Sequence, residues 1–191
     1  MTDEIHARIM ERVIYPTVRG MAAEGNVYTG FLYAGLMIDA AGNPKVIEFN
    51  CRFGDPETQP IMLRMRSDLV ALCLAACAGE LDKQEAVYDS RAAVGVVLAA
   101  ANYPGEPQKG DVIHGLDAGN NVDIKLFQAG TAQRGDDVVT AGGRVLCATA
   151  LGNTVQEAQQ QAYALAKQVS WDGMFYRSDI GYRAIAREQG K

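Results

Sequence analysis

Residues 45–60, KVIEFNCRFGDPETQP, contain the pattern on which the fold prediction rests. From residue 47 to residue 53 apolar and polar side chains alternate strictly, which is typical of a β-strand with one covered face. Glu48, Asn50 and Arg52 occupy the polar parity. Because residues i and i+2 of a strand point the same way, we expect these three side chains to form a row on one face.

This row combines a carboxylate, an amide oxygen and a guanidinium. Glu48 and Asn50 offer hard oxygen ligands, which suit Mg²⁺ and leave coordination positions for water and phosphate. Arg52, one step further along, is able to hold an anion through two parallel hydrogen bonds. The alternation alone also fits an ordinary half-buried strand whose polar face meets water, and both interpretations stay open on this evidence.

The residues after this strand predict the start of a helix. Gly54 frees the backbone, Asp55 suits an N-cap, Pro56 suits the first helical position, and Glu57 is a first-turn acid. Asp55 and Glu57 are therefore explained equally well as helix-capping residues or as part of a site. A helix start placed directly after a metal-binding strand is also a favourable place for an anion.

Hydrophobic patterns predict four elements before residue 80. They are a helix over 4–24, a buried strand over 31–38, a second strand over 45–49, and a helix over 60–78. Pro16 must kink or break the first helix. A turn over 40–44 joins the two strands into a hairpin, and Gly79 ends the last helix.

Residues 80–91 are polar and without periodicity, so we place a domain boundary here, giving domains over 1–85 and 86–191. Beyond it we expect buried or antiparallel strands over 92–101, 122–130, 138–141 and 144–152, and a helix over 155–169. Gly142 and Gly143 suit a two-residue hairpin turn. Thr154 and Glu157 form a capping box that opens the helix. The predicted fold class is α+β in both parts.

Composition excludes several classes of function. The chain has 191 residues and a net charge of −5, with no basic patch for nucleic acid and no apolar run of the ~20 residues that a membrane span needs. Four cysteines without a C-x-x-C pair and two isolated histidines leave little material for a zinc site or a nucleophilic triad. Free, apolar-flanked cysteines fit a reducing cytosol, so we expect a cytoplasmic protein.

The stretch VIEFNCRFGDPETQ resembles the metal-binding strand and the R-F-G-D-P-E-x-Q motif of the phosphoribosylamine–glycine ligases, members of the ATP-grasp superfamily. The E-x-N-x-R kernel is common to many ATP-grasp enzymes, whereas R-F-G-D-P-E is far more specific. Supporting stretches are YPTVRGMAAEG, YTGFLYAGLM, GGRVLCATALG and MFYRSDIGYRAI, so the likeness spans the whole chain. It implies the C-terminal part of an ATP-grasp domain, an antiparallel sheet with helices, followed by a small α+β C-terminal domain.

The resemblance also implies an activity, in which ATP, glycine and 5-phosphoribosylamine give glycinamide ribonucleotide, ADP and phosphate by way of glycyl phosphate. ATP is then a co-substrate, and Mg²⁺ or Mn²⁺ is the cofactor. The implied roles are Glu48 and Asn50 as metal ligands, Arg52 as the catalytic group on the transferring phosphoryl or the glycine carboxylate, and Gly54, Asp55 and Glu57 as substrate contacts.

The chain departs from the family at its front. No glycine-rich phosphate loop precedes residue 20, so we expect the missing N-terminal half of the enzyme as a partner and no activity from the chain alone. Two alternatives remain: another ATP-grasp ligase, of the biotin-carboxylase or carbamoyl-phosphate-synthetase kind, and a non-catalytic binding or assembly module. Arg144 and Lys125 are weaker candidates for contact with a substrate phosphate. The alternative is that Arg144 is an ordinary exposed turn residue and Lys125 a solvated strand residue.

Overall fold

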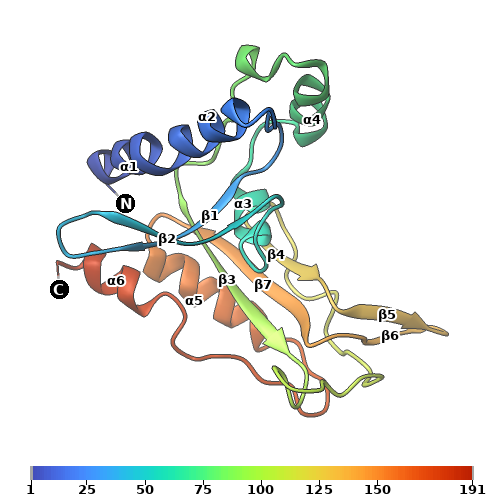
Figure 1. Ribbon diagram of the computed structural model, residues 1–191. Coiled ribbons are helices and arrows are strands. Elements are labelled where there is room, and N and C mark those ends of the chain that lie inside the picture. The colour runs from blue at the N-terminus through green and yellow to red at the C-terminus, as the bar shows by residue number, and fades with distance from the viewer. Residues whose placement is uncertain (1, 191) are drawn as a thin grey trace. The chain divides into compact units, whose positions relative to one another are not determined.

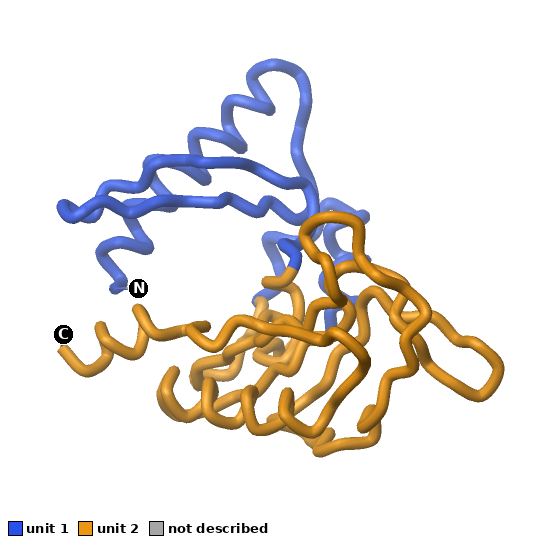
Figure 2. The backbone as a smooth tube through the Cα atoms, turned by 90° about the horizontal axis from the view of Figure 1, so that it is seen from below, with its two compact units in different colours: residues 1–55, 68–85 blue, residues 56–67, 86–191 orange. Residues whose placement is uncertain are grey.

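The computed structural model describes residues 2–190, which form two compact units (Figure 2). Unit 1 contains the described residues up to 55 together with 68–85, and unit 2 contains 56–67 and 86–190. The chain therefore passes from one unit to the other three times. The domain limits at 85 and 86 stay a prediction, since compact units do not by themselves test them.

Unit 1 begins with a continuous helical stretch made of α1 (Asp3–Ile9), a π-helical turn (Met10–Ile14) and α2 (Tyr15–Ala23). The prediction of a helix here is confirmed, but Pro16 does not break it. Pro16 directly follows the π turn, and such a local widening of the helix accommodates a residue that cannot donate an N–H.

The predicted hairpin is confirmed, because β1 (Tyr33–Ile38) pairs antiparallel with β2 (Pro44–Asn50) (Figure 1). The prediction that the first strand is buried is wrong. No residue of β1 is buried, and Met37 is 61% exposed. A sheet of two strands has few neighbours to cover it, so apolar residues on both faces keep contact with solvent.

The single helix predicted over 60–78 is wrong, since two helices occupy this stretch. They are α3 (Thr58–Arg64) in unit 2 and α4 (Leu69–Ala78) in unit 1. Met65 is extended and forms a bridge with Tyr88, which stops α3. A helical periodicity cannot reveal this break, because the interrupting partner lies more than twenty residues away in the sequence.

The ends of these helices show which capping signals operate. The Asp68 carboxylate accepts hydrogen bonds from the backbone N–H groups of Val70 and Ala71 and starts α4. Gly79, in the left-handed region, ends α4 as predicted. The N-cap of α3 is Glu57, so the prediction of Asp55 at that position is wrong. A short 3₁₀ helix, Leu81–Lys83, follows α4.

Unit 2 is built on a three-stranded antiparallel sheet in the order β3-β7-β4 (Figure 1). Its strands are β3 (Ala92–Ala99), β7 (Arg144–Gly152) and β4 (Ile124–Gln128). A second, two-stranded sheet pairs β5 (Thr131–Arg134) with β6 (Asp137–Thr140). The prediction of an antiparallel strand over 144–152 is confirmed, and β7 is central and almost wholly buried.

Helices cover the three-stranded sheet on both faces. The predicted capping box is present, since Thr154 Oγ1 accepts from the N–H of Glu157 and opens α5 (Val155–Ala166). The apolar stripe of α5 packs on the face that carries Val94 and Val96. α3 packs on the other face, where Pro60 lies against Gly95. A last helix, α6 (Tyr182–Glu188), closes the chain.

The prediction of a hairpin turn at Gly142 and Gly143 is wrong. β6 pairs with β5 and β7 pairs with β3 and β4, so these glycines join strands of two different sheets. These glycines leave space for their neighbours: a Cβ on Gly143 would lie 2.3 Å from the Tyr103 ring, and a Cβ on Gly142 would lie 3.1 Å from the Gly130 Cα. Between residues 2 and 190, no helix has the length and apolar character to cross a bilayer.

Candidate functional site

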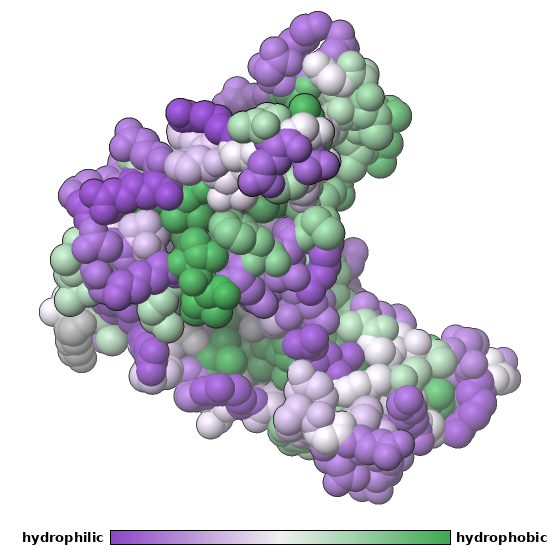
Figure 3. All heavy atoms as spheres, viewed as in Figure 1, coloured by the Kyte–Doolittle hydropathy of each residue, from purple (hydrophilic) through white to green (hydrophobic). Residues whose placement is uncertain are grey.

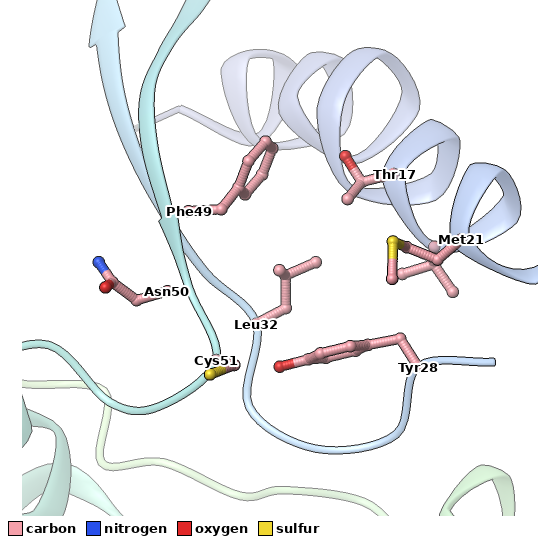
Figure 4. Close-up of a pocket in the computed structure, with 8 residues that line it drawn as sticks. Thr17, Met21, Tyr28, Leu32, Phe49, Asn50 and Cys51 are labelled. Atoms are coloured by element: carbon pink, nitrogen blue, oxygen red, sulfur yellow. The ribbon is translucent and has the colours of Figure 1, made fainter. Parts of the chain in front are cut away.

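Glu48 and Asn50 lie on the same face of β2. In the antiparallel pairing Glu48 is opposite Gly35 and Asn50 is opposite Tyr33. Figure 4 shows Phe49 pointing toward α2 and the amide of Asn50 pointing away from it. Because Glu48 is two residues before Asn50, the pleat directs both of their side chains to the face opposite Phe49. The alternation seen in the sequence therefore predicts the orientation of these two side chains correctly.

Gly35 makes room for Glu48. A Cβ built on Gly35 would lie 2.9 Å from the Glu48 Cγ and 3.7 Å from its Oε1. The pairing of the two strands shifts by a bulge directly after Gly35. Bulges next to a site re-aim a side chain, and here the absence of a side chain at 35 lets the Glu48 carboxylate lie over the neighbouring strand.

Arg52 is not the third member of a strand row, so this part of the prediction is wrong. β2 ends at Asn50, and Arg52 lies in the bend that follows. Its Nη1 donates to the carbonyl oxygen of Phe53 at 2.9 Å. The Phe53 ring in turn stacks on Phe31, with centroids 4.1 Å apart. Arg52 therefore follows the end of β2 closely in the chain, but it is not part of the strand that carries Glu48 and Asn50.

The remaining motif residues are distributed over the two units. Gly54 is buried and Asp55 is exposed, and both belong to unit 1. Glu57 is exposed and belongs to unit 2, at the start of α3. The structure thus brings Glu48 and Asn50 together on one face of β2, and Arg52 to Asp55 lie in the loop that follows. Glu57 lies at the start of α3, the helix that packs on the three-stranded sheet of unit 2.

The oxygen donors of Glu48 and Asn50 fit a metal ion that also coordinates water molecules and phosphate oxygens. Within the described residues 2–190, no three His, Cys, Asp or Glu side chains gather into a complete metal site. Glu48 and Asn50 provide two oxygen donors from one face, which suits a partly hydrated Mg²⁺ or Mn²⁺ shared with a nucleotide. Structural zinc sites are built mainly from cysteine thiolates and histidine imidazoles, and neither Glu48 nor Asn50 is such a ligand.

An apolar cavity of about 330 Å³ lies in unit 1 between α2 and the hairpin (Figure 4). Its lining includes Met21, Tyr28, Leu32 and Phe49. It lies on the side of β2 that Phe49 faces, opposite the side on which the Glu48 side chain lies. Sequence reasoning did not find this cavity, because its walls come from a helix, a loop and a strand whose contacts have no local signature.

The two weaker candidates are both in unit 2. Arg144 is the first residue of β7 rather than a hairpin tip, and its Cζ lies 6.0 Å from the centroid of the Tyr103 ring. Lys125 is exposed on β4, with its Nζ 5.4 Å from the centroid of the Phe127 ring. Lys125 therefore has the surroundings of a solvated strand residue.

Comparison with known families identifies both parts of the chain. Residues 1–58 match the model described as phosphoribosylglycinamide synthetase, ATP-grasp (A) domain. Residues 93–183 match the model described as phosphoribosylglycinamide synthetase, C domain. The motif residues from Glu48 to Glu57 fall inside the first match.

Proteins named phosphoribosylamine–glycine ligase align with this chain over its full length. A phosphoribosylamine–glycine ligase of Vibrio vulnificus is 69% identical over all 191 residues, which make up 44% of that protein. The crystal structure of phosphoribosylamine–glycine ligase from Thermotoga maritima aligns with a TM-score of 0.79 at 37% identity, covering 94% of this chain and 44% of that one. The chain thus spans less than half the length of these relatives.

A more distant likeness concerns the fold alone. The biotin carboxylase domain of a 2-oxoglutarate carboxylase from Hydrogenobacter thermophilus aligns with a TM-score of 0.61 at 16% identity, over 92% of this chain and 38% of that one. This alignment shows a similar fold, whereas high sequence identity is found with the glycine ligases.

Proposed function

Since the chain belongs to the phosphoribosylamine–glycine ligase family, as the C-terminal part that joins an ATP-grasp domain to a C domain, we propose that it forms the metal-binding and substrate-binding part of such a ligase. The reaction joins glycine to 5-phosphoribosylamine with hydrolysis of ATP in purine biosynthesis. The single observation that supports this most directly is the shared face of Glu48 and Asn50, cleared by Gly35.

The proposed reaction has two steps. The glycine carboxylate attacks the γ-phosphorus of ATP, so that an oxygen–phosphorus bond forms and ADP leaves. The amine of 5-phosphoribosylamine then attacks the acyl carbon of glycyl phosphate, loses a proton, and expels inorganic phosphate. No redox change occurs, and no histidine base is needed, which agrees with the two isolated histidines of the chain.

The residues contribute by binding and orienting. Glu48 and Asn50 would hold Mg²⁺ or Mn²⁺, and the bound ion would supply charge neutralisation at the phosphate oxygens. Arg52 carries the catalytic guanidinium, which binds the transferring phosphoryl or the glycine carboxylate. Gly54 and Asp55 contact substrate from unit 1.

Glu57 is the proposed substrate contact from unit 2, at the start of α3. Its carboxylate suits an amine or a ribose hydroxyl rather than a phosphate, because like charges repel.

The test is Glu48→Gln in a full-length ligase that contains this chain. The substitution removes a charge and keeps the shape, so the fold should persist while most glycine-dependent ADP formation is lost. A matched control is Glu24→Gln, which neutralises an exposed carboxylate at the end of α2 and should leave the rate unchanged. Near-normal turnover of Glu48→Gln at saturating Mg²⁺ would refute the assignment.

The 191-residue chain alone should not turn over. ATP-grasp enzymes hold the nucleotide between two lobes, and the relatives are more than twice as long as this chain. Without that positioning, the reaction loses a lowering of the activation free energy that reaches about 7–11 kcal/mol in well-oriented reactions. Glycine-dependent ADP release by the homogeneous 191-residue chain would show that the proposed N-terminal partner is not required.

A further inference from the structure

A short antiparallel pairing joins the end of α3 to the segment before β3, entirely within unit 2. The Arg66 N–H donates to the Val87 carbonyl at 2.8 Å, and the Asp89 N–H donates to the Arg64 carbonyl at 2.7 Å. Met65 and Tyr88 form the bridge between these bonds. The helix that follows the motif R-F-G-D-P-E is thus tied by its C-terminal end to the segment that leads into β3.

Asp89 is the centre of this junction. Its carboxylate accepts from the Arg91 backbone N–H at 2.9 Å, from Arg91 Nε at 3.0 Å and Nη2 at 2.8 Å, and from Arg66 Nη2. Its carbonyl oxygen accepts two bonds from Arg64, at 3.0 and 2.7 Å. The Asp89 side chain is only 9% exposed. Charged hydrogen bonds from Arg91, then Arg66, hold the pKa of the Asp89 carboxyl below its usual value.

The same cluster extends into the sheet. Arg91 Nη2 also donates to the Asp123 carboxylate at 2.7 Å. The Asp123 carbonyl accepts from the N–H of Leu151 on β7 at 2.8 Å. We name these side chains the Asp89 cluster: Arg64, Arg66, Asp89, Arg91 and Asp123. Through it, the last turn of α3 is connected to the central strand of unit 2.

The first turn of α3 is fixed independently. A Cβ on Gly95 would lie 3.1 Å from the Pro60 Cγ and 3.0 Å from the Cys147 Sγ. The ring of Pro60 therefore rests directly on the backbone of β3, where any larger residue than glycine would push the helix away. α3 is thus held on the sheet at both ends, by packing at Pro60 and by the charged cluster at Asp89.

We propose that Asp89 is a positioning residue for the ligase reaction, because through Arg64 and Arg66 it fixes α3 and hence the direction of Glu57. Glu57 is the N-cap of α3, so its place follows the helix. This inference rests on the proposed function. According to this inference, the orientation of Glu57 depends in part on Asp89, which lies outside the motif R-F-G-D-P-E and more than thirty residues after it.

The test compares Asp89→Asn with the parent in the full-length ligase and in the 191-residue chain. In the ligase, kcat/KM for glycine or 5-phosphoribosylamine should fall by about tenfold or more, while KM for Mg-ATP stays within about twofold. Arg64→Lys keeps the charge but loses the paired bonds to the Asp89 carbonyl, and should shift the same constants in the same direction.

Hydrogen exchange gives a readout that does not depend on activity. In the 191-residue chain, Asp89→Asn should speed exchange of the Ile61 amide in α3 and of the Met65 amide that caps its end, and should leave the amides of β7 protected. Asp136→Asn is the matched control, since it removes an exposed carboxylate on the β5–β6 turn and should change neither measurement.

The outcomes separate the two proposals. A parent ligase without glycine-dependent ADP formation would refute the proposed function, and the catalytic part of this inference with it. Unchanged α3 exchange in Asp89→Asn would refute the positioning role whatever the activity. A fall in all kinetic constants in proportion to the unfolded fraction would also overturn it, because Asp89 would then be structural only.

Discussion

The Glu48 side chain lies over the bare Cα of Gly35 on the neighbouring strand, at a position where a Cβ would come within 2.9 Å of Glu48 Cγ. The face of β2 that carries Glu48, the proposed metal ligand, thus depends on the absence of a side chain at residue 35. The relationship concerns the carboxylate alone, since Asn50 is opposite Tyr33 and Arg52 lies beyond the strand.

Gly35→Ala should therefore displace the Glu48 carboxylate without unfolding the hairpin. The backbone of Gly35 does not have a positive φ, so alanine is tolerated there, and the flexible glutamate has to move. We expect the Mg²⁺ concentration for half-maximal ligase activity to rise by about tenfold, with little change in melting temperature. The control is Gly20→Ala, where nothing lies within 4 Å of the added Cβ. Equal Mg²⁺ dependence in parent and Gly35→Ala would contradict the prediction.

Arg52→Lys should lower the ligase rate by at least ~10-fold, equal to roughly 1.4 kcal/mol of transition-state stabilisation. Lysine keeps the positive charge but loses the planar fork that binds an anion at two points. It also loses the bond that Arg52 Nη1 makes to the Phe53 carbonyl. Single-turnover measurement of ADP formation checks the effect, and a rate equal to that of the parent would mean that the guanidinium has only a structural role.

Gly143→Ala should destabilise unit 2 by about 1–3 kcal/mol, because the new Cβ would overlap the Tyr103 ring. Removal of that ring in the double variant Gly143→Ala/Tyr103→Ala should return part of the loss. Urea unfolding of the single and double variants measures the coupling energy. Strictly additive effects would show that the two residues do not meet.

Asp89→Asn should remove part of the pH dependence of stability. The Asp89 pKa is lowered in the folded state by Arg91 and Arg66, so the ionised carboxylate stabilises the fold above the unfolded pKa of about 3.9. That contribution is lost as the pH falls below about 4 toward the folded pKa. Asp123, on the other side of Arg91, has a lowered pKa for the same reason and adds to the effect.

The measurement for Asp89 is urea unfolding at pH 7, 5 and 3. The difference in unfolding free energy between parent and Asp89→Asn should be largest at pH 7 and shrink toward pH 3. Asp136→Asn should show no such trend. A difference that stays constant with pH would indicate that the ionised form of Asp89 is not what stabilises the fold.

Leu74→Lys should reduce self-association of the 191-residue chain without lowering its stability. α4 is apolar all round, and Figure 3 shows green side chains over this helix at the upper right. Leu74 is 66% exposed, whereas Leu165, in the core of unit 2, is 2% exposed. Light scattering measures association, and Leu165→Lys, which should unfold unit 2, is the contrast. More association of Leu74→Lys than of the parent would contradict the prediction.

Local signals in the sequence predicted the elements whose cause is local. The capping box at Thr154, the left-handed stop at Gly79 and the buried run of β3 each depend on a few neighbouring residues. The polar parity of β2 likewise predicted the face on which Glu48 and Asn50 lie, since alternation in a strand is set by the backbone.

Tertiary structure decided whatever depends on a partner distant in sequence. Tyr88 ends α3 and splits one predicted helix into two, and β7 lies between β3 and β4 instead of pairing across Gly142 and Gly143. The physical reason is that strand pairing and charge clusters are chosen by burial against remote segments, which adjacent residues do not encode. The motif itself could be read from the sequence, but the space that Gly35 gives Glu48 and the support that Asp89 gives α3 exist only in the folded chain.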